Sequence, residues 1–192
     1  TSILGVQVQS GSGTSLLRGM SVTKFGVFVT NDSNATIDQL EISTTTPSDA
    51  ANRAGAIFVA DGASVDVRDS TILSSAGYGL LATDASSVTL ARTVISQTDE
   101  SGFWVQCTAQ CDCVTPTTVS LDNVLLNSTA GLTLIAANAT FETLSLKNTA
   151  SGLGIFSGGA TAQGLVVASC STVVGNNIEH TNGFGTGLFV DQ

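Results

Sequence analysis

A short hydrophobic pattern recurs along the whole chain. It consists of a small residue followed by an apolar residue, a variable residue and a second apolar residue, and glycine directly precedes nearly every copy. Successive middle residues are 21, 30, 23, 23, 29, 23 and 33 positions apart. A step near 21 to 23 with occasional longer steps predicts a structural unit of fixed size that carries inserted loops. The copies are Val6–Val8, Val27–Val29, Ile57–Val59, Leu80–Ala82, Phe103–Val105, Leu132–Leu134, Ile155–Ser157 and Leu188–Val190.

A second pattern follows each triplet. An apolar residue is followed three positions later by a small or apolar residue, and two positions later by another apolar residue. The step of two is strand periodicity, and the step of three lets the chain turn a corner. The members are Leu17/Met20/Val22, Ile37/Leu40/Ile42, Val67/Ser70/Ile72, Leu90/Thr93/Ile95, Leu121/Val124/Leu126, Phe141/Leu144/Leu146 and Val173/Asn176/Ile178.

Together the two patterns predict an all-β fold, a parallel β-helix (β-solenoid) of about seven coils with 21–33 residues in each coil. No 3.6-residue helical period occurs, and a β-sandwich would need hairpin turns every 8 to 12 residues, roughly half the observed step. We expect residues 1–192 to form a single β-helix domain, a segment of a longer protein, because the pattern is already running at Val6 and is still running at Val190.

The repeats resemble those of a known superfamily. The segments GAIFVADGASVDVRDSTILSSAG and GLLATDASSVTLARTVIS are similar to right-handed β-helix repeats of the pectate-lyase-like superfamily, above all to its non-catalytic bacterial surface and secreted members. The resemblance implies right-handed coiling. Because this fold carries many functions, it does not by itself imply an activity.

Strand alternation assigns the two faces of each triplet. The flanking residues are apolar everywhere except at Ser157, so they are expected to point into the core. The middle residues then point outward and form one column, which we call the outward aromatic column. Its proposed binding residues are Phe28, Phe58, Leu81, Trp104, Phe156 and Phe189, with Gln7 and Thr133 also in line.

An exposed apolar row of this length requires an explanation. The column is covered by a loop, a neighbouring domain or a second copy; it binds a polysaccharide by ring stacking; or it stabilises the sheet as a stacked ladder. The expected partner is therefore a polysaccharide or another protein surface.

Four cysteines lie in what the pattern indicates are two inserted loops at the same corner. Cys107, Cys111 and Cys113 follow Val105, and Cys170 ends the segment from Ser157 to Ser171. We expect two disulfides, with Cys170 bonded to one of the other three, and three connectivities remain open. Four thiolates could instead bind zinc, but the paired C-x-x-C spacing is missing, and we predict no metal and no cofactor.

Composition limits the partners and the compartment. The net charge is −9 with only six Lys and Arg, which disfavours nucleic acid and anionic lipid as partners. No apolar run approaches the ~18 residues of a membrane span, so membrane insertion is not expected. Few charges, many small polar residues and an even number of cysteines favour an extracellular, cell-surface or periplasmic location.

No catalytic set emerges from the motifs. Asp61, Asp66, Asp69 and Asp84 are expected in solvated turns and in charge pairs with Arg68 and Arg92, and His180 beside Glu179 is expected on an exposed turn. We therefore favour a secreted or cell-surface module that binds or has a structural, adhesive role. The alternatives are a polysaccharide-active enzyme, of the lyase or glycoside hydrolase type, and a self-assembling fibre subunit.

Overall fold

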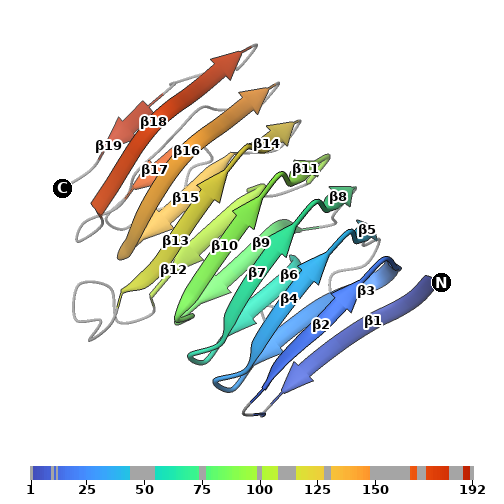
Figure 1. Cartoon of the computed structure of the whole chain (residues 1–192). Helices are drawn as coiled ribbons and strands as arrows, with labels where there is room; N and C mark the ends of the chain where they lie inside the picture. The colour runs from blue at the N-terminus through green and yellow to red at the C-terminus, as the bar shows by residue number, and fades with distance from the viewer. Residues whose placement is uncertain are drawn as a thin grey trace.

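The computed structural model is an all-β, right-handed solenoid of stacked coils (Figure 1). It describes residues 2–9, 11, 13–43, 55–73, 77–98, 101–107, 116–127, 131–147, 165–167, 172–181 and 188–190. Within these residues every regular element is a strand, and every strand pair is parallel. The predicted fold class is confirmed.

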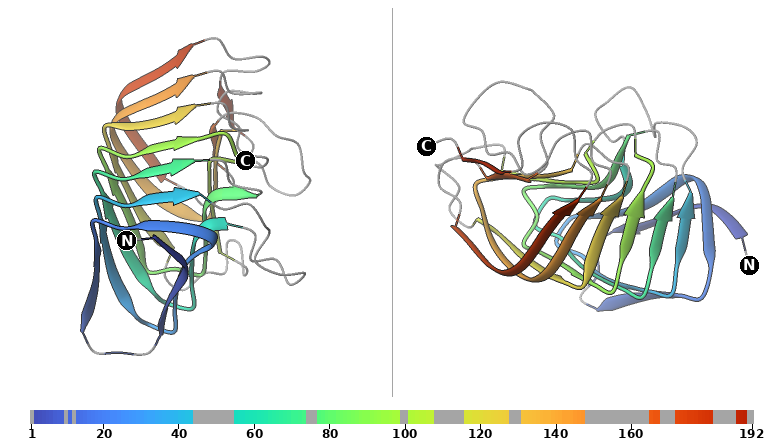
Figure 2. Two further views of the ribbon diagram at one scale, coloured as in Figure 1. Left: turned by 90° about the vertical axis from the view of Figure 1, so that its right-hand side faces the viewer. Right: turned by 90° about the horizontal axis from the view of Figure 1, so that it is seen from above.

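The strands stack into three parallel ladders that wrap around one core. Both views in Figure 2 show the coils following one another along the stack. Ladder A carries the triplets, ladder B follows it in each coil, and ladder C closes the coil. Strands β1, β3, β16 and β18 bend through a corner and so belong to two ladders each. Ladder A contains β1 (Ser2–Gln9), β3 (Ser21–Thr30), β6 (Gly55–Ala60), β9 (Tyr78–Thr83), β12 (Phe103–Gln106), β15 (Leu132–Ile135), β17 (Leu165–Val167) and β19 (Leu188–Val190).

Ladders B and C are built in the same way. Ladder B contains β2 (Thr14–Arg18), β4 (Asn34–Asp38), β7 (Ser64–Arg68), β10 (Ser87–Ala91), β13 (Thr117–Asp122), β16 (Ala137–Lys147) and β18 (Thr172–Thr181). Ladder C contains parts of β1, β3, β16 and β18 together with β5 (Glu41–Ser43), β8 (Thr71–Leu73), β11 (Val94–Ser96) and β14 (Val124–Asn127).

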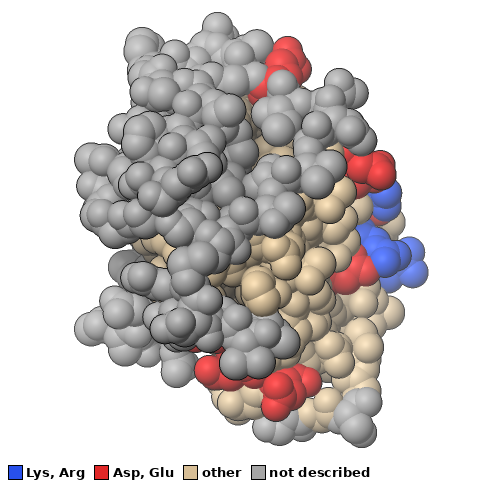
Figure 3. All heavy atoms as spheres, turned by 90° about the vertical axis from the view of Figure 1, so that its left-hand side faces the viewer, with Lys and Arg blue, Asp and Glu red and all other residues tan. Residues whose placement is uncertain are grey.

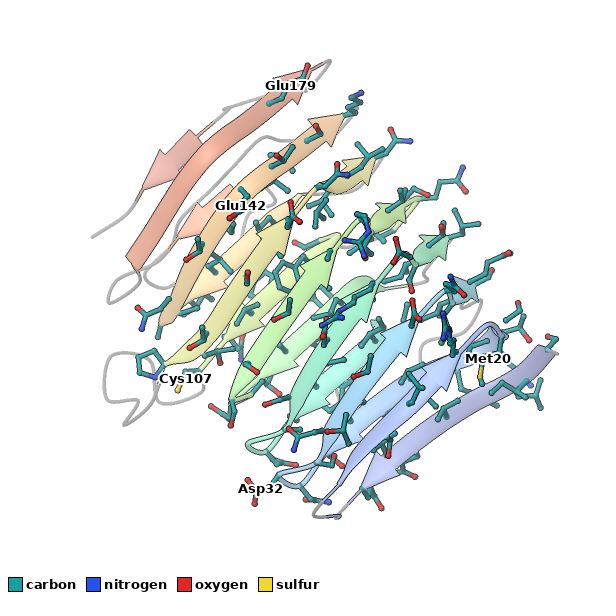
Figure 4. All side chains as sticks on the ribbon, in the orientation of Figure 1. Met20, Asp32, Cys107, Glu142 and Glu179 are labelled. Atoms are coloured by element: carbon teal, nitrogen blue, oxygen red, sulfur yellow. The ribbon has the colours of Figure 1, made fainter. Side chains whose placement is uncertain are left out.

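The core lies between the ladders and contains residues that the two patterns assign to the interior, together with apolar residues near the start of ladder B strands, such as Val65 and Val88. Val27, Val29, Leu80 and Phe103 are fully buried, as are the ladder C residues such as Ile42. The alternation of branched apolar residues with small polar ones lets each strand bury one face and leave the other outside. Figure 4 shows the two corners at the ends of ladder B, with Asp32 at the corner before β4 and Met20 at the corner after β2.

Buried hydroxyl groups bond to backbone groups at these corners. Ser70 Oγ accepts a hydrogen bond from Leu40 N at 3.1 Å and donates one to Arg68 O at 2.6 Å. Thr93 Oγ1 donates to Ala91 O at 3.0 Å one coil later. A serine or threonine is therefore tolerated at a buried corner position because its hydroxyl bonds to backbone groups beside it.

The prediction of the seventh triplet, Ile155–Ser157, is wrong. In the coil after Leu132–Leu134, ladder A is formed by β17, with Leu132 opposite Leu165 and Thr133 opposite Val166. Residues 155–157 lie outside the described residues. The segment Gly164–Val167 carries the same glycine and triplet pattern, and its flanks are both apolar, whereas Ser157 would place a hydroxyl at an inward position. The correct steps along the column are 33 residues from Thr133 to Val166 and 23 from Val166 to Phe189.

Two further predictions change with this register. Phe141, Leu144 and Leu146 lie opposite Gly175, Ile178 and His180, so the last corner signature is shifted by two residues from Val173/Asn176/Ile178. The error arises because a shift of two preserves strand alternation and is therefore invisible to a face assignment. His180 lies within strand β18 rather than on a turn.

Candidate functional site

The outward aromatic column is in register across ladder A. Gln7 lies opposite Phe28, Phe28 opposite Phe58, and Phe58 opposite Leu81. Trp104 lies between Leu81 and Thr133. Neighbouring members are thus one strand apart, ~4.8 Å in a parallel sheet.

The end of the column differs from the prediction at one position. Val166 occupies the place assigned to Phe156, and Phe189 lies opposite Val166. Phe156 itself lies outside the described residues. Phe189 keeps its predicted register, and the described residues establish only its backbone position.

Much of the column is buried although it faces away from the main core. Phe58 is 7% exposed and Leu81 is 6% exposed, and together with Ala60 they form a second apolar cluster on the outer side of ladder A. Phe28, Tyr78 and Trp104 are half-buried and pack against this cluster. The middle of the column is consequently not an open surface, and the partly exposed aromatic rings at this cluster are Phe28 and Trp104 of the column and Tyr78 beside it.

Two ring pairs give this cluster its shape. The Phe28 and Phe58 rings are tilted, with centroids 6.2 Å apart. The Tyr78 and Trp104 rings meet edge to face, with centroids 5.6 Å apart and an interplanar angle of 63°. Edge-to-face packing places the positive ring edge on the negative ring face, which stabilises the pair.

Trp104 also has a polar partner. Its Nε1–H donates a hydrogen bond to Gln106 Oε1 at 2.9 Å. Because residues two apart on a strand share a face, the amide lies beside the indole on the outside of ladder A. We call Tyr78, Trp104 and Gln106 the Trp104 platform.

The cysteine insertions do not share a corner. The first insertion lies where it was predicted, between β12 and β13 at the corner from ladder A to ladder B. In the coil that contains β17 and β18, Val167 and Val173 are six positions apart, as are Val59 and Val65 in a coil without an insertion. The long segment 148–164 comes before β17 instead. Cys170 therefore belongs to a short connection between β17 and β18 rather than to a long loop.

Cys107 is the one cysteine among the described residues. It follows β12, is buried and is disulfide-bonded, and it lies at the ladder A end of this corner (Figure 4). Cys111, Cys113 and Cys170 lie outside the described residues, so the connectivity stays a prediction.

The predicted acidic residues are distributed as turns and ion pairs. Asp61, Asp69 and Asp84 have positive φ at corners, whereas Asp66 lies within strand β7. Arg68 is paired with Asp66, and Arg92 with Asp69 at 2.7 Å, so basic and acidic groups lie side by side (Figure 3). The hydrogen bond from Arg92 lowers the pKa of Asp69 and raises the pKa of Arg92 itself.

Within the part of the chain that the structure describes, no three His, Cys, Asp or Glu side chains are grouped closely enough to hold a metal ion. The same residues include no helix that is long and apolar enough to cross a bilayer.

Sequence reasoning identified Trp104 but missed Tyr78 and Gln106. Tyr78 precedes its triplet and lies outside the repeating pattern, and Gln106 is one of several polar residues that follow a triplet. Gln106 could have been found from its spacing, because it lies two residues after Trp104 on the same strand and therefore shares its outward face.

Comparison with known proteins places the chain at the level of the fold. The family model described as the right-handed beta helix region matches residues 4–160. No curated protein and no solved structure matches the chain. Since the match spans most of the sequence and agrees with the parallel, three-ladder architecture, the chain belongs to the right-handed β-helix family.

Proposed function

We propose that this chain is a non-catalytic binding module of a secreted or cell-surface protein, and that it binds a polysaccharide at the Trp104 platform. The observation that carries the proposal is the half-buried Tyr78–Trp104 pair, which is held beside the Gln106 amide on the outer face of ladder A. An aromatic face can stack on the apolar face of a sugar ring while an amide bonds its hydroxyl groups.

The scaffold supports such a role because it fixes the platform before a ligand arrives. Strand β12, which carries Trp104 and Gln106, is paired with β9 on one side and with β15 on the other. A group that is already ordered loses little conformational entropy on binding, and affinity rises accordingly.

The burial of Phe58 and Leu81 narrows the predicted site. Side chains that are 6–7% exposed offer almost no area to a ligand, so the proposal does not extend along the whole column. Phe28 is half-buried and remains a second contact, two strands away from Leu81 along ladder A.

The test is binding of the purified chain to a panel of neutral and acidic polysaccharides, with the reaction products analysed in parallel. We expect binding without depolymerisation, and we expect Trp104→Ala to weaken it at least about tenfold, which corresponds to ~1.4 kcal/mol of stacking and contact energy. Leu125→Ala is the matched control, because Leu125 is a half-buried, outward apolar residue on ladder C.

The other outcomes decide between the remaining functions. Depolymerisation of any glycan would identify a polysaccharide lyase or glycoside hydrolase. Absence of glycan binding, together with an apparent molar mass from light scattering that rises with protein concentration, would identify a self-assembling fibre subunit. Equal affinity of the wild-type chain and Trp104→Ala would remove the Trp104 platform as the binding site.

A further inference from the structure

Two side chains, Tyr78 and Gln106, contact the Trp104 indole. Tyr78 meets the ring edge to face, a contact that leaves rotation of the indole only partly restricted. The hydrogen bond from Nε1–H to Gln106 Oε1 at 2.9 Å adds a directional constraint within the ring plane. The two contacts together define one orientation of the ring.

Gln106 is suited to impose this constraint because its backbone is held on both sides. Its carbonyl oxygen accepts a hydrogen bond from Asp84 N at 3.0 Å in the preceding coil. The next residue, Cys107, donates from its backbone N to Ile135 O at 3.2 Å and is buried and disulfide-bonded. The amide therefore extends from a fixed point at the end of β12.

We propose that Gln106 is the positioning residue of the Trp104 platform and that it also selects the ligand, an inference that rests in its second part on the proposed function. Oε1 accepts the hydrogen bond from the indole, and Nε2, which takes no part in that bond, offers the two donor hydrogens of the amide. The platform thus recognises a ring that stacks on Trp104 and places an acceptor oxygen, such as a sugar hydroxyl or ring oxygen, next to Gln106.

The positioning role can be tested without a ligand. Trp104 is the only tryptophan of the chain, so its fluorescence anisotropy decay reports the motion of this ring alone. We expect Gln106→Leu to add a fast local depolarisation, and Gln106→Glu to retain the slow decay because a carboxylate still accepts from Nε1–H. Gln9→Leu, at the equivalent position two residues after Gln7 on β1, should change nothing. An unchanged decay in Gln106→Leu would overturn the positioning role.

The selecting role is tested by affinity for the glycan that the wild-type chain binds best. Gln106→Leu and Gln106→Glu both remove the donor, and each should weaken binding by roughly threefold to tenfold, the loss expected for one hydrogen bond. Wild-type affinity in Gln106→Glu would overturn this role. If the wild-type chain binds no glycan while Gln106→Leu frees the ring, the proposed function is wrong and the positioning role stands.

Discussion

At the scale of single residues, the corner from ladder B to ladder C shows which residue types the chain places in the left-handed conformation. The residues before the buried corner position adopt the left-handed conformation, with φ of 55° at Gln39, 48° at Asp69, 47° at Arg92 and 54° at Asn123. Only asparagine and aspartate are common at such positions. Because glutamine and arginine also occur here, residue type alone could not have predicted this column of strained turns, although the step of three predicted the corner itself.

The buried hydroxyl of Ser70 gives a direct test at this scale. Ser70→Ala removes the acceptor of the buried Leu40 N–H and the donor to Arg68 O. We expect a loss of about 1–3 kcal/mol in the free energy of unfolding, the cost of leaving a buried polar group unsatisfied. Urea denaturation measures it. Ser120→Ala, on the outer side of β13, should stay within about 0.5 kcal/mol of the wild type, and an equal loss in both variants would contradict the assignment.

At the scale of elements, the sequence predicted most strands and their faces but misplaced one. Two segments of the chain after Lys147 fit the apolar-x-apolar pattern, and the pattern does not say which of them extends the ladder. The pairing of Leu165–Val167 with Leu132–Leu134 decides. Val167 and Val173 are then six positions apart, as are Val59 and Val65. Strand β16 also differs from the earlier coils, because it continues from ladder B into ladder C as one unbroken strand. Thr143 occupies the position that is left-handed in earlier coils, and a β-branched residue disfavours that conformation.

The pair of Arg92 with Asp69 connects two consecutive coils, and pH tests it. The lowered pKa of Asp69 means that the folded state binds this proton less tightly than the unfolded chain, whose aspartate titrates near 3.8. The stabilisation is therefore complete above that pH and is lost as the pH falls through the folded-state pKa. In Arg92→Ala we expect the pKa of Asp69 to rise toward 3.8, as followed by carboxyl NMR titration. Arg18→Ala is the control, because Arg18 pairs with Asp38 and is not among the charged groups that shift the pKa of Asp69, so it should leave Asp69 unchanged.

At the scale of the whole molecule, the solenoid could be predicted because each coil repeats the same constraints. The glycine before the triplets, the alternation of apolar residues within strands and the recurring step near 23 residues all indicate the same stacking. A sequence specifies a fold when its local and long-range patterns agree in this way. The candidate site was predicted only in part. Alternation places Phe58, Leu81 and Trp104 outside the core, but it carries no information on what packs over them, so the burial of Phe58 and Leu81 emerged only from the structure.

Distances between spin labels on the outer column of ladder B test the stacking most directly. Thr14, Asn34, Thr118 and Asn138 are all exposed there and lie in one register, and labels introduced as unnatural amino acids would leave the cysteines intact. In-register coils predict mean separations that grow by ~4.8 Å for each strand, hence ~19 Å from Thr14 to Thr118 and ~24 Å from Thr14 to Asn138. Separations that do not grow with the number of intervening strands would contradict the stacked, parallel arrangement.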